Sequence, residues 1–168
     1  MPDRPHGGTA DWAGNNCWGY VPGGAVVTHD LTFSVPGVPS GKGRHRMTRT
    51  GLAYTPAATV AAERAIRAAF RESYPRAKPH DGPVEIAVLA LFEPPSSWPK
   101  WKRSLALAGL WTHQVAPDCD NIAKAILALN GIAYADDAQV YDCHTRREYS
   151  DVARTVVRLR MFDAQVKP

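Results

Sequence analysis

The sequence predicts an α+β domain in which a small mixed sheet of about four strands packs against two or three helices. Its 168 residues fit one domain, and 45% of them are hydrophobic, which is enough to build one core. Segments with strand-type and helix-type spacing follow one another in the order strand, helix, strand, short helix, helix, strand, strand. We therefore expect a domain over 31–163, with a disordered Gly-rich extension over 1–30 and a tail over 164–168.

The first half of the domain should contain a strand and a long helix. Residues 31–35 alternate apolar and polar side chains, as a half-buried strand does. A helix is expected from Pro56, with Thr55 as its N-cap, to about Tyr74. Its core face carries small and apolar residues at helical spacing: Ala62, Ile66, Ala69, Phe70 and Ser73. A second face carries three arginines, which either meet DNA or are simply solvated: Arg64, Arg67 and Arg71.

The second half should contribute the centre of the sheet. Residues 84–92 are β-branched at the start and apolar for most of their length, so this strand belongs at the centre. A short helix is expected over 98–110, and a further helix over 121–129 with Asp120 as its cap and a C-cap glycine at Gly131. Strands complete the domain at 139–145 and 153–162.

The distribution of charge is more informative than its sum. The chain has a net charge of +4, yet residues 118–142 hold five aspartates and one lysine, a local −4 that leaves +8 for the rest. A basic body with one acidic pocket suits an enzyme that holds a polyanion and needs a metal where it cuts. An unevenly charged, solvated surface is the alternative explanation.

The cysteine count and the hydropathy pattern indicate the compartment. The three cysteines form no C-x-x-C pair, and no apolar run is long enough to cross a membrane or to serve as a signal peptide. We expect a soluble cytoplasmic protein with free thiols and no membrane partner.

The candidate site is an acidic motif around the helix over 121–129. In an extended segment, Asp118 and Asp120 would point the same way, because residues two apart share a side. Asp136 or Asp137 would approach them if the next strand pairs beside the strand that precedes the helix. Each close carboxylate pair would cost on the order of 4 kcal/mol at an effective dielectric of about 20. A hard divalent cation relieves that repulsion, and ligands that are all oxygen select Mg²⁺ or Mn²⁺.

Such a site has a known use in phosphodiester hydrolysis, where the metal neutralises the phosphate and activates water. Lys124, one helical turn beyond Asp120, would place a fixed positive charge beside the phosphate. An Asp-Asp pair is also common in turns, and an aspartate before a helix is often only a cap. A calcium loop from Asp118 is excluded because Ala123 and Leu129 occupy its glycine and glutamate positions.

Two basic segments are candidate DNA contacts. The loop over 41–49 carries four cations with glycines between them: Lys42, Arg44, Arg46 and Arg49. The segment over 98–103 interleaves tryptophans with three more: Lys100, Lys102 and Arg103. A solvated loop, and tryptophans that pin a surface helix to the core, are the ordinary alternatives.

Together these motifs resemble one family. Pro-Asp-x-Asp-Asn-x-x-Lys over 117–124, Ala-Leu-Asn-Gly over 128–131 and Tyr-x-Asp-Asp-Ala-Gln-Val over 134–140 are similar to the signature of the RusA family of Holliday-junction resolvases. The basic segments, with Ala-Tyr-Thr-Pro over 53–56 and His113, resemble its upstream blocks. The resemblance covers about residues 31–162.

The resemblance implies a homodimer that cuts four-way junction DNA in a metal-dependent, structure-selective way. It also implies a role in DNA recombination and repair. Genes of this family commonly lie in phages and prophages. It implies metal ligands at Asp118, Asp120 and Asp137, with Asp136 as a possible fourth, and a catalytic Lys124. His113 joins the DNA-binding residues on the same basis. A less selective nuclease of branched or flap DNA, and a junction-binding protein without catalysis, remain as alternatives.

The sequence departs from the family at two positions. Ala116 replaces a frequent lysine, and Ala128 replaces a frequent aspartate in the helix. Neither change removes a proposed ligand.

Overall fold

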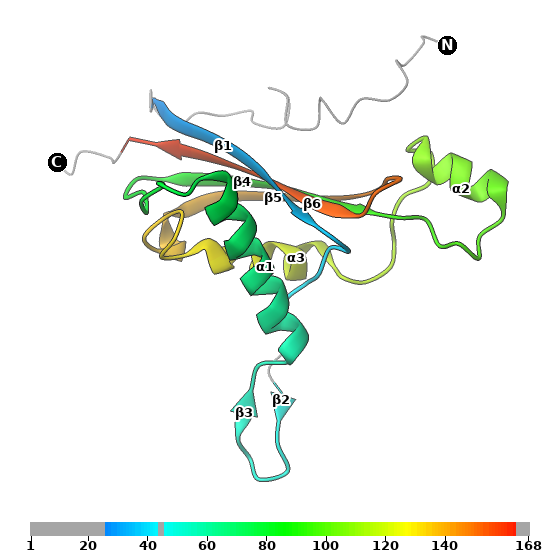
Figure 1. The fold of residues 1–168 in the computed structure, drawn as a ribbon, viewed down its shortest axis with the longest axis horizontal. Coiled ribbons are helices and arrows are strands. Elements are labelled where there is room, and N and C mark those ends of the chain that lie inside the picture. Colours follow the sequence, from blue (N-terminus) through cyan, green and yellow to red (C-terminus); the bar gives the residue numbers. More distant parts are fainter. Residues whose placement is uncertain (1–25, 44–45, 164–168) are drawn as a thin grey trace.

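The computed structural model describes residues 26–43 and 46–163. Its centre is a four-stranded mixed sheet in the order β1-β6-β4-β5, with α1 and α3 on one face (Figure 1). These strands are β1 (Val27–Pro36), β4 (Val84–Phe92), β5 (Val140–Tyr149) and β6 (Arg154–Phe162). The predicted α+β class and the size of the sheet are confirmed.

Among the described residues, three helices accompany the sheet: α1 (Ala57–Ser73), α2 (Lys100–Leu107) and α3 (Cys119–Ile126). Two 3₁₀ turns follow α3: η2 (Leu127–Leu129) and η3 (Asp137–Gln139). The element order agrees with the sequence prediction except for a small hairpin of β2 (Arg46–Met47) and β3 (Ala53–Tyr54), which was expected to be loop. This hairpin projects from the body beyond the start of α1 (Figure 1).

Strand β4 lies at the centre of the sheet, as its apolar sequence predicted. All nine of its residues are buried, and it pairs antiparallel with β6 and parallel with β5. The parallel pairing places β5 beside the strand that precedes α3. The approach of Asp136 or Asp137 to the start of α3 was expected to require this pairing, and the pairing is present.

The core lies between the sheet and the two helices that cover it. Phe33 of β1 meets Phe70 of α1 edge to face, with ring centroids 5.5 Å apart. Ile122 and Ile126 of α3 are each 1% exposed. The predicted core face of α1 is confirmed at Ile66, Ala69 and Phe70, but Ser73 is exposed.

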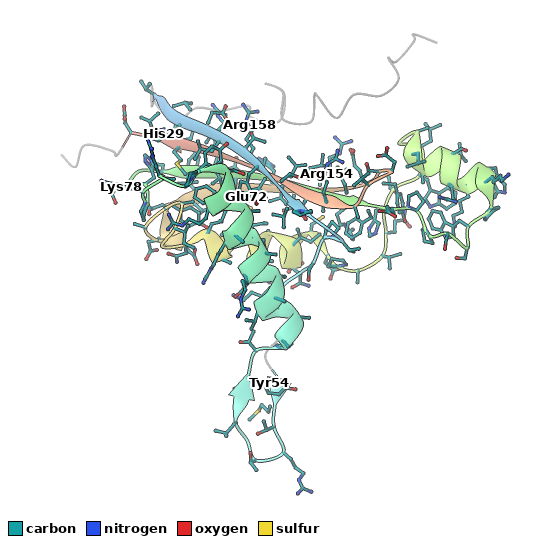
Figure 2. All side chains as sticks on the ribbon, viewed as in Figure 1. His29, Tyr54, Glu72, Lys78, Arg154 and Arg158 are labelled. Carbon is teal, nitrogen blue, oxygen red and sulfur yellow. The ribbon has the colours of Figure 1, made fainter. Side chains whose placement is uncertain are left out.

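The other face of the sheet carries charged side chains, and none of the described helices lies over it (Figure 1). Arg158 of β6 donates to Asp30 of β1, and Arg160 donates to Glu85 of β4 at 3.0 Å. Figure 2 shows Arg158 on this side of the sheet, away from α1. The tyrosine hydroxyl of Tyr141 also donates to Glu85. Ion pairs therefore link neighbouring strands on this face.

Several boundaries differ from the sequence prediction. Strand β1 starts at Val27, within the predicted extension, because its first residues pair with the end of β6. Pro56, not Thr55, is the N-cap of α1, and Asp118, not Asp120, is the N-cap of α3. The predicted disorder before residue 26 and the tail over 164–168 lie outside the described residues.

Two further expectations concern the cysteines and the membrane. Cys119 and Cys143 are free thiols, as expected, and Cys119 is half-buried. Cys17 lies outside the described residues. In the described part of the chain, the helices are too short or too polar to span a membrane.

Candidate active site

Two predicted metal ligands, Asp118 and Asp120, lie at the start of α3, but their backbone conformations differ from those expected. Asp118 has an extended backbone (φ −74°, ψ 158°) as N-cap, and its side chain makes no cap hydrogen bond. Asp120 already belongs to the first helical turn. The prediction that both lie in one extended segment is therefore wrong, because the helix begins one residue after Asp118. Arg147 of β5 fixes the approach to the helix by donating to the carbonyl of Pro117 at 3.0 Å.

Lys124 lies one turn beyond Asp120 and pairs with it. Its Nζ is 3.0 Å from Oδ2 of Asp120, and the two side chains are 57% and 64% exposed. The hydrogen bond from Lys124 is the main cause that lowers the pKa of Asp120, and nearby backbone N–H groups lower it further. Asp120 is therefore an ionised, open carboxylate at neutral pH.

A cavity of about 440 Å³ joins Lys124 to Asp137. The other residues that line it come from the loop before the hairpin, from α1 and from the end of α3: Lys42, Glu63, Arg67, Leu127, Ala128 and Asn130. Three of its residues are cations and two are acids, and Lys42 Nζ lies 3.5 Å from Glu63 Oε1. The excess of positive charge suits an anionic ligand.

The turn η3 fixes the position of Asp137. Asp136 caps this turn, since its Oδ1 accepts from the backbone N–H of Ala138 at 2.7 Å. Gln139 accepts from the backbone of Asp136 and donates to the carbonyls of His80 and Gly82. One oxygen of Asp136 is thus engaged locally, whereas Asp137 lines the cavity. The structure assigns Asp136 a role in holding the turn.

The predicted convergence of three carboxylates is not seen. Within residues 26–43 and 46–163, no three side chains of His, Cys, Asp or Glu lie close enough together to hold a metal ion. Lys124 is the residue that connects the two halves of the motif, because it pairs with Asp120 and lines the same cavity as Asp137. The structure therefore shows an open site with the lysine between the acids.

The cations predicted in the loop over 41–49 have different positions. Lys42 lines the cavity, and its backbone N–H donates to the carbonyl of Asn121 in α3 at 2.8 Å. Arg49 is exposed in the turn of the hairpin. Arg44 and the side chain of Arg46 lie outside the described residues. Of the two predicted DNA contacts whose side chains the structure describes, Lys42 lines the candidate cavity and Arg49 does not.

The basic segment of α2 packs on its own tryptophans. Lys102 Nζ lies 3.8 Å from the ring centroid of Trp98 and 4.6 Å from that of Trp111. Lys100 and Arg103 are exposed. Trp98 also meets Tyr149 of β5 with ring centroids 5.4 Å apart, so this tryptophan attaches the segment to the body, while Lys100 and Arg103 stay available to a ligand.

His113 does not lie where a DNA contact needs it. Its ring is 8% exposed and stacks on Phe92 with centroids 3.9 Å apart, and it also meets Tyr149. Burial lowers the pKa of His113, with a smaller contribution from the positive charge of Arg147. The ring is a neutral part of the core, so the predicted DNA-binding role of His113 is not supported by its position.

Sequence reasoning missed Glu63 and Arg67 as residues of the site. They lie four residues apart on α1, so they share one helix face. Arg67 was expected in an arginine stripe, but its Nε donates to the carbonyl of Ala128 at 2.8 Å and ties α1 to η2. The i,i+4 acid–base spacing was the available signal, although only the packing of α1 on η2 shows which face meets the cavity.

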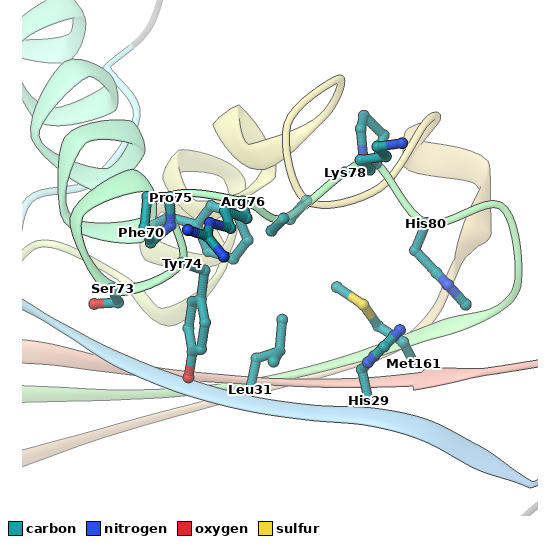
Figure 3. A pocket seen from close by; sticks show the side chains of 13 residues that line it. His29, Leu31, Phe70, Ser73, Tyr74, Pro75, Arg76, Lys78, His80 and Met161 are labelled. Carbon is teal, nitrogen blue, oxygen red and sulfur yellow. The ribbon is translucent and has the colours of Figure 1, made fainter.

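A larger cavity of about 560 Å³ lies elsewhere, between the end of α1, the edge of β1 and the loop before β4 (Figure 3). Its walls include Leu31, Tyr74, Lys78, His80 and Met161, and none of the residues that line it is acidic. It offers no carboxylate to a metal. Size alone therefore does not decide which of the two cavities is the candidate site.

The comparison with known proteins identifies the family. The family model described as endodeoxyribonuclease RusA matches residues 36–160, which is well over half of the chain. The chain belongs to the RusA family. The matched span includes α3, η3 and every residue of the 440 Å³ cavity.

The chain is also similar to a curated protein. It is 36% identical over 86 residues to the uncharacterized protein YqaN of Bacillus subtilis (strain 168). The alignment covers 49% of this chain and 61% of that relative, so the chain spans less than two thirds of its length. The name of this relative assigns it no activity.

Proposed function

We propose that this RusA-family chain is a structure-selective endonuclease that resolves four-way DNA junctions by hydrolysing phosphodiester bonds. The observation that carries the proposal is the position of Lys124, which pairs with Asp120 at 3.0 Å and shares a cavity with Asp137. A cation between carboxylates on an open surface suits a phosphodiester that enters from solvent. The match to the RusA family model over the same residues supports this assignment.

The oxygen donors of the site fit Mg²⁺, with Mn²⁺ as a substitute. Mg²⁺ is commonly held by one or two carboxylates, while water and substrate phosphate complete its shell. That pattern does not require three acids in contact before DNA binds, so the open arrangement of Asp118, Asp120 and Asp137 is compatible with it. Asp136 would position Asp137 by capping η3. The chemistry that such an ion supplies is neutralisation of the phosphate and activation of a water.

The other residues of the site would bind and orient the DNA strand. Lys124 would hold its ammonium group beside the scissile phosphate, while Asp120 stays ionised because of that same ammonium group. Lys42 and Arg67, which both line the cavity, would neutralise neighbouring phosphates. Glu63 limits how far Lys42 can move, since the two are paired.

The wider setting belongs to the same proposal. Resolution needs two opposed cuts and each site serves one strand, so a homodimer with two-fold symmetry is the expected assembly. We expect the enzyme to act in the cytoplasm in DNA recombination and repair, and to come from a phage or prophage gene.

A nicking assay on a synthetic four-way junction tests the activity. The wild-type chain should cut the junction with Mg²⁺ and not with EDTA, whereas Asp120→Asn should bind it without cutting. Asp163→Asn is the matched control, because Asp163 is an exposed aspartate at the end of β6 outside the site. Cutting by Asp120→Asn at the wild-type rate would contradict the site assignment.

A competition experiment tests the selectivity. Junction, flap and linear duplex of equal length are offered together with Mg²⁺. Preferential cutting of the junction supports a resolvase, while equal cutting of flap and junction would reduce the proposal to a general branched-DNA nuclease.

A further inference from the structure

The hairpin of β2 and β3 carries apolar side chains into solvent at the end of a projection. Met47 is 71% exposed, Leu52 69% and Tyr54 45%. Figure 2 shows Tyr54 on the projecting hairpin, away from the sheet and its core. Three large apolar side chains on one short protrusion are unusual unless they meet a partner.

The end of the hairpin is a structured turn. Thr48 donates its backbone N–H to the carbonyl of Leu52 at 2.8 Å and accepts from Gly51 at 3.0 Å. Its hydroxyl accepts from the N–H of Leu52 at 3.1 Å. Gly51 has a φ of +81°, which favours glycine at this position. The exposed side chains are therefore presented on a defined turn.

The base of the hairpin is part of the candidate site. The N–H of Lys42 bonds to Asn121, and the N–H of Gly43 bonds to the hydroxyl of Thr59 at 3.1 Å. A Cβ atom at Gly41 would lie 2.9 Å from side-chain atoms of Pro117 and Asn121, so glycine permits this close approach to α3. A DNA strand in the cavity beside Lys42 would therefore pass the root of the hairpin.

The charge of this region favours nucleic acid as the occupant. Residues 40–62 contain no acid and four cations: Lys42, Arg44, Arg46 and Arg49. A second copy of the same hairpin would bring like charges together. DNA has the opposite charge, and its base faces become accessible where stacking is interrupted, as at a branch point.

We propose that this hairpin is a wedge that places Met47 and Leu52 against unstacked bases at the branch point of DNA bound at the candidate site. Met and Leu are among the apolar side chains that DNA-bending proteins insert between base steps. Arg49, in the turn between them, contacts a flanking phosphate. This inference rests on the proposed action on branched DNA and adds the element that would recognise the branch.

Fluorescence of 2-aminopurine tests the wedge. The probe is a four-way junction with 2-aminopurine at the branch point, in EDTA so that nothing is cut, and a second junction carries it within one arm. The wild-type chain should give a several-fold rise at the branch and little change in the arm. Met47→Ser with Leu52→Ser should bring the rise at the branch close to background. Both side chains are exposed, so the fold should tolerate these changes.

Leu110→Ser is the matched control, because Leu110 is exposed to 72% in the segment after α2. It should keep the full fluorescence rise. An undiminished rise in the double variant would overturn the wedge, even if the wild type cuts junctions. A double variant that loses a dimer by sedimentation yet keeps the rise would also overturn it and indicate a contact between copies. A wedge signal in a wild type that never cuts would support the wedge and contradict the proposed nuclease activity.

Discussion

Two acid–cation pairs with the same separation lie in contrasting regions of this molecule. Arg160 and Glu85 are 3.0 Å apart on the charged face of the sheet, where their side chains are 12% and 1% exposed. Lys124 and Asp120 are also 3.0 Å apart, at the start of α3, but are 57% and 64% exposed. The distance is equal, so burial is what separates the two pairs.

Burial decides what each pair does. Glu85 receives a second hydrogen bond from Tyr141, and burial together with that bond raises the pKa of Tyr141. A buried carboxylate with two donors is committed to the fold. The exposed pair adds little to stability, since water competes with it. It can therefore exchange its partner for a ligand, and this contrast distinguishes a structural pair from a candidate site.

The largest expected effect comes from breaking the buried pair. Arg160→Met should lower the free energy of unfolding by about 3–5 kcal/mol, because Glu85 loses the cation that compensates its buried charge. Urea denaturation measures it. Arg146→Met is the control, since Arg146 pairs with Glu148 at 2.6 Å while its side chain is 64% exposed. Equal losses in the two variants would contradict the role given to burial.

Removing the cation of the exposed pair should affect activity much more than stability. Lys124→Met should reduce the rate of junction cutting on the order of 100-fold, as expected when a group that stabilises transition-state charge is removed. The free energy of unfolding should change by less than about 1 kcal/mol, because the pair is exposed. Single-turnover cutting and urea denaturation on the same preparation give both values. If Lys124→Met lost activity only because its free energy of unfolding fell by a comparable amount, the functional role given to the exposed pair would be contradicted.

A third pair, Arg158 and Asp30, is intermediate, with side chains 20% and 40% exposed. The hydrogen bond from Arg158 is the main cause that lowers the pKa of Asp30 in the folded chain. Its contribution is therefore present above the unfolded pKa of about 3.9 and is lost as pH falls through the lower folded pKa. We expect less than about 1 kcal/mol, given the exposure of Asp30.

Urea denaturation as a function of pH measures this contribution. Wild type should be more stable than Asp30→Asn at neutral pH, and the difference should vanish below the folded pKa of Asp30. A difference that grows on acidification would have the wrong sign for a lowered pKa.

The smallest expected effect is a change in the pKa of Asp120. Lys124→Met removes the largest cause of the lowered pKa of Asp120, so that pKa should rise toward its ordinary value. Carbon-13 NMR of the side-chain carboxyl group follows it. An unchanged titration would mean that backbone donors alone keep Asp120 ionised.

The fold was predictable to the extent that it depends on local pattern. The apolar run of β4 indicated a central strand, and its parallel pairing with β5 follows from the intervening helices. The hairpin was missed because β2 and β3 have two residues each, too few for alternation to register. The cap of α3 was misplaced by two residues because Asp118 and Asp120 are both good cap residues.

The site was predictable in its residues more than in its geometry. The spacing of Asp120 and Lys124 predicts contact on one helix turn, and the structure shows it. The position of Asp137 in the cavity depends on how Gln139 holds η3 against the carbonyls of His80 and Gly82, which no local pattern reveals. The family resemblance predicted a DNA-binding role for His113, whereas stacking on Phe92 makes this residue part of the core.

We propose that Asp120 and Asp137, which belong to no three-ligand group among the described residues of the free chain, serve one metal when DNA is bound. Broadening of backbone amide NMR signals by Mn²⁺ tests it most directly, with a junction whose scissile phosphates are replaced by uncleavable analogues. If one ion is shared, the amides of Asn121 and Ala138 should broaden together at the same low Mn²⁺ concentration. Broadening at one of them alone, or at neither, would contradict it.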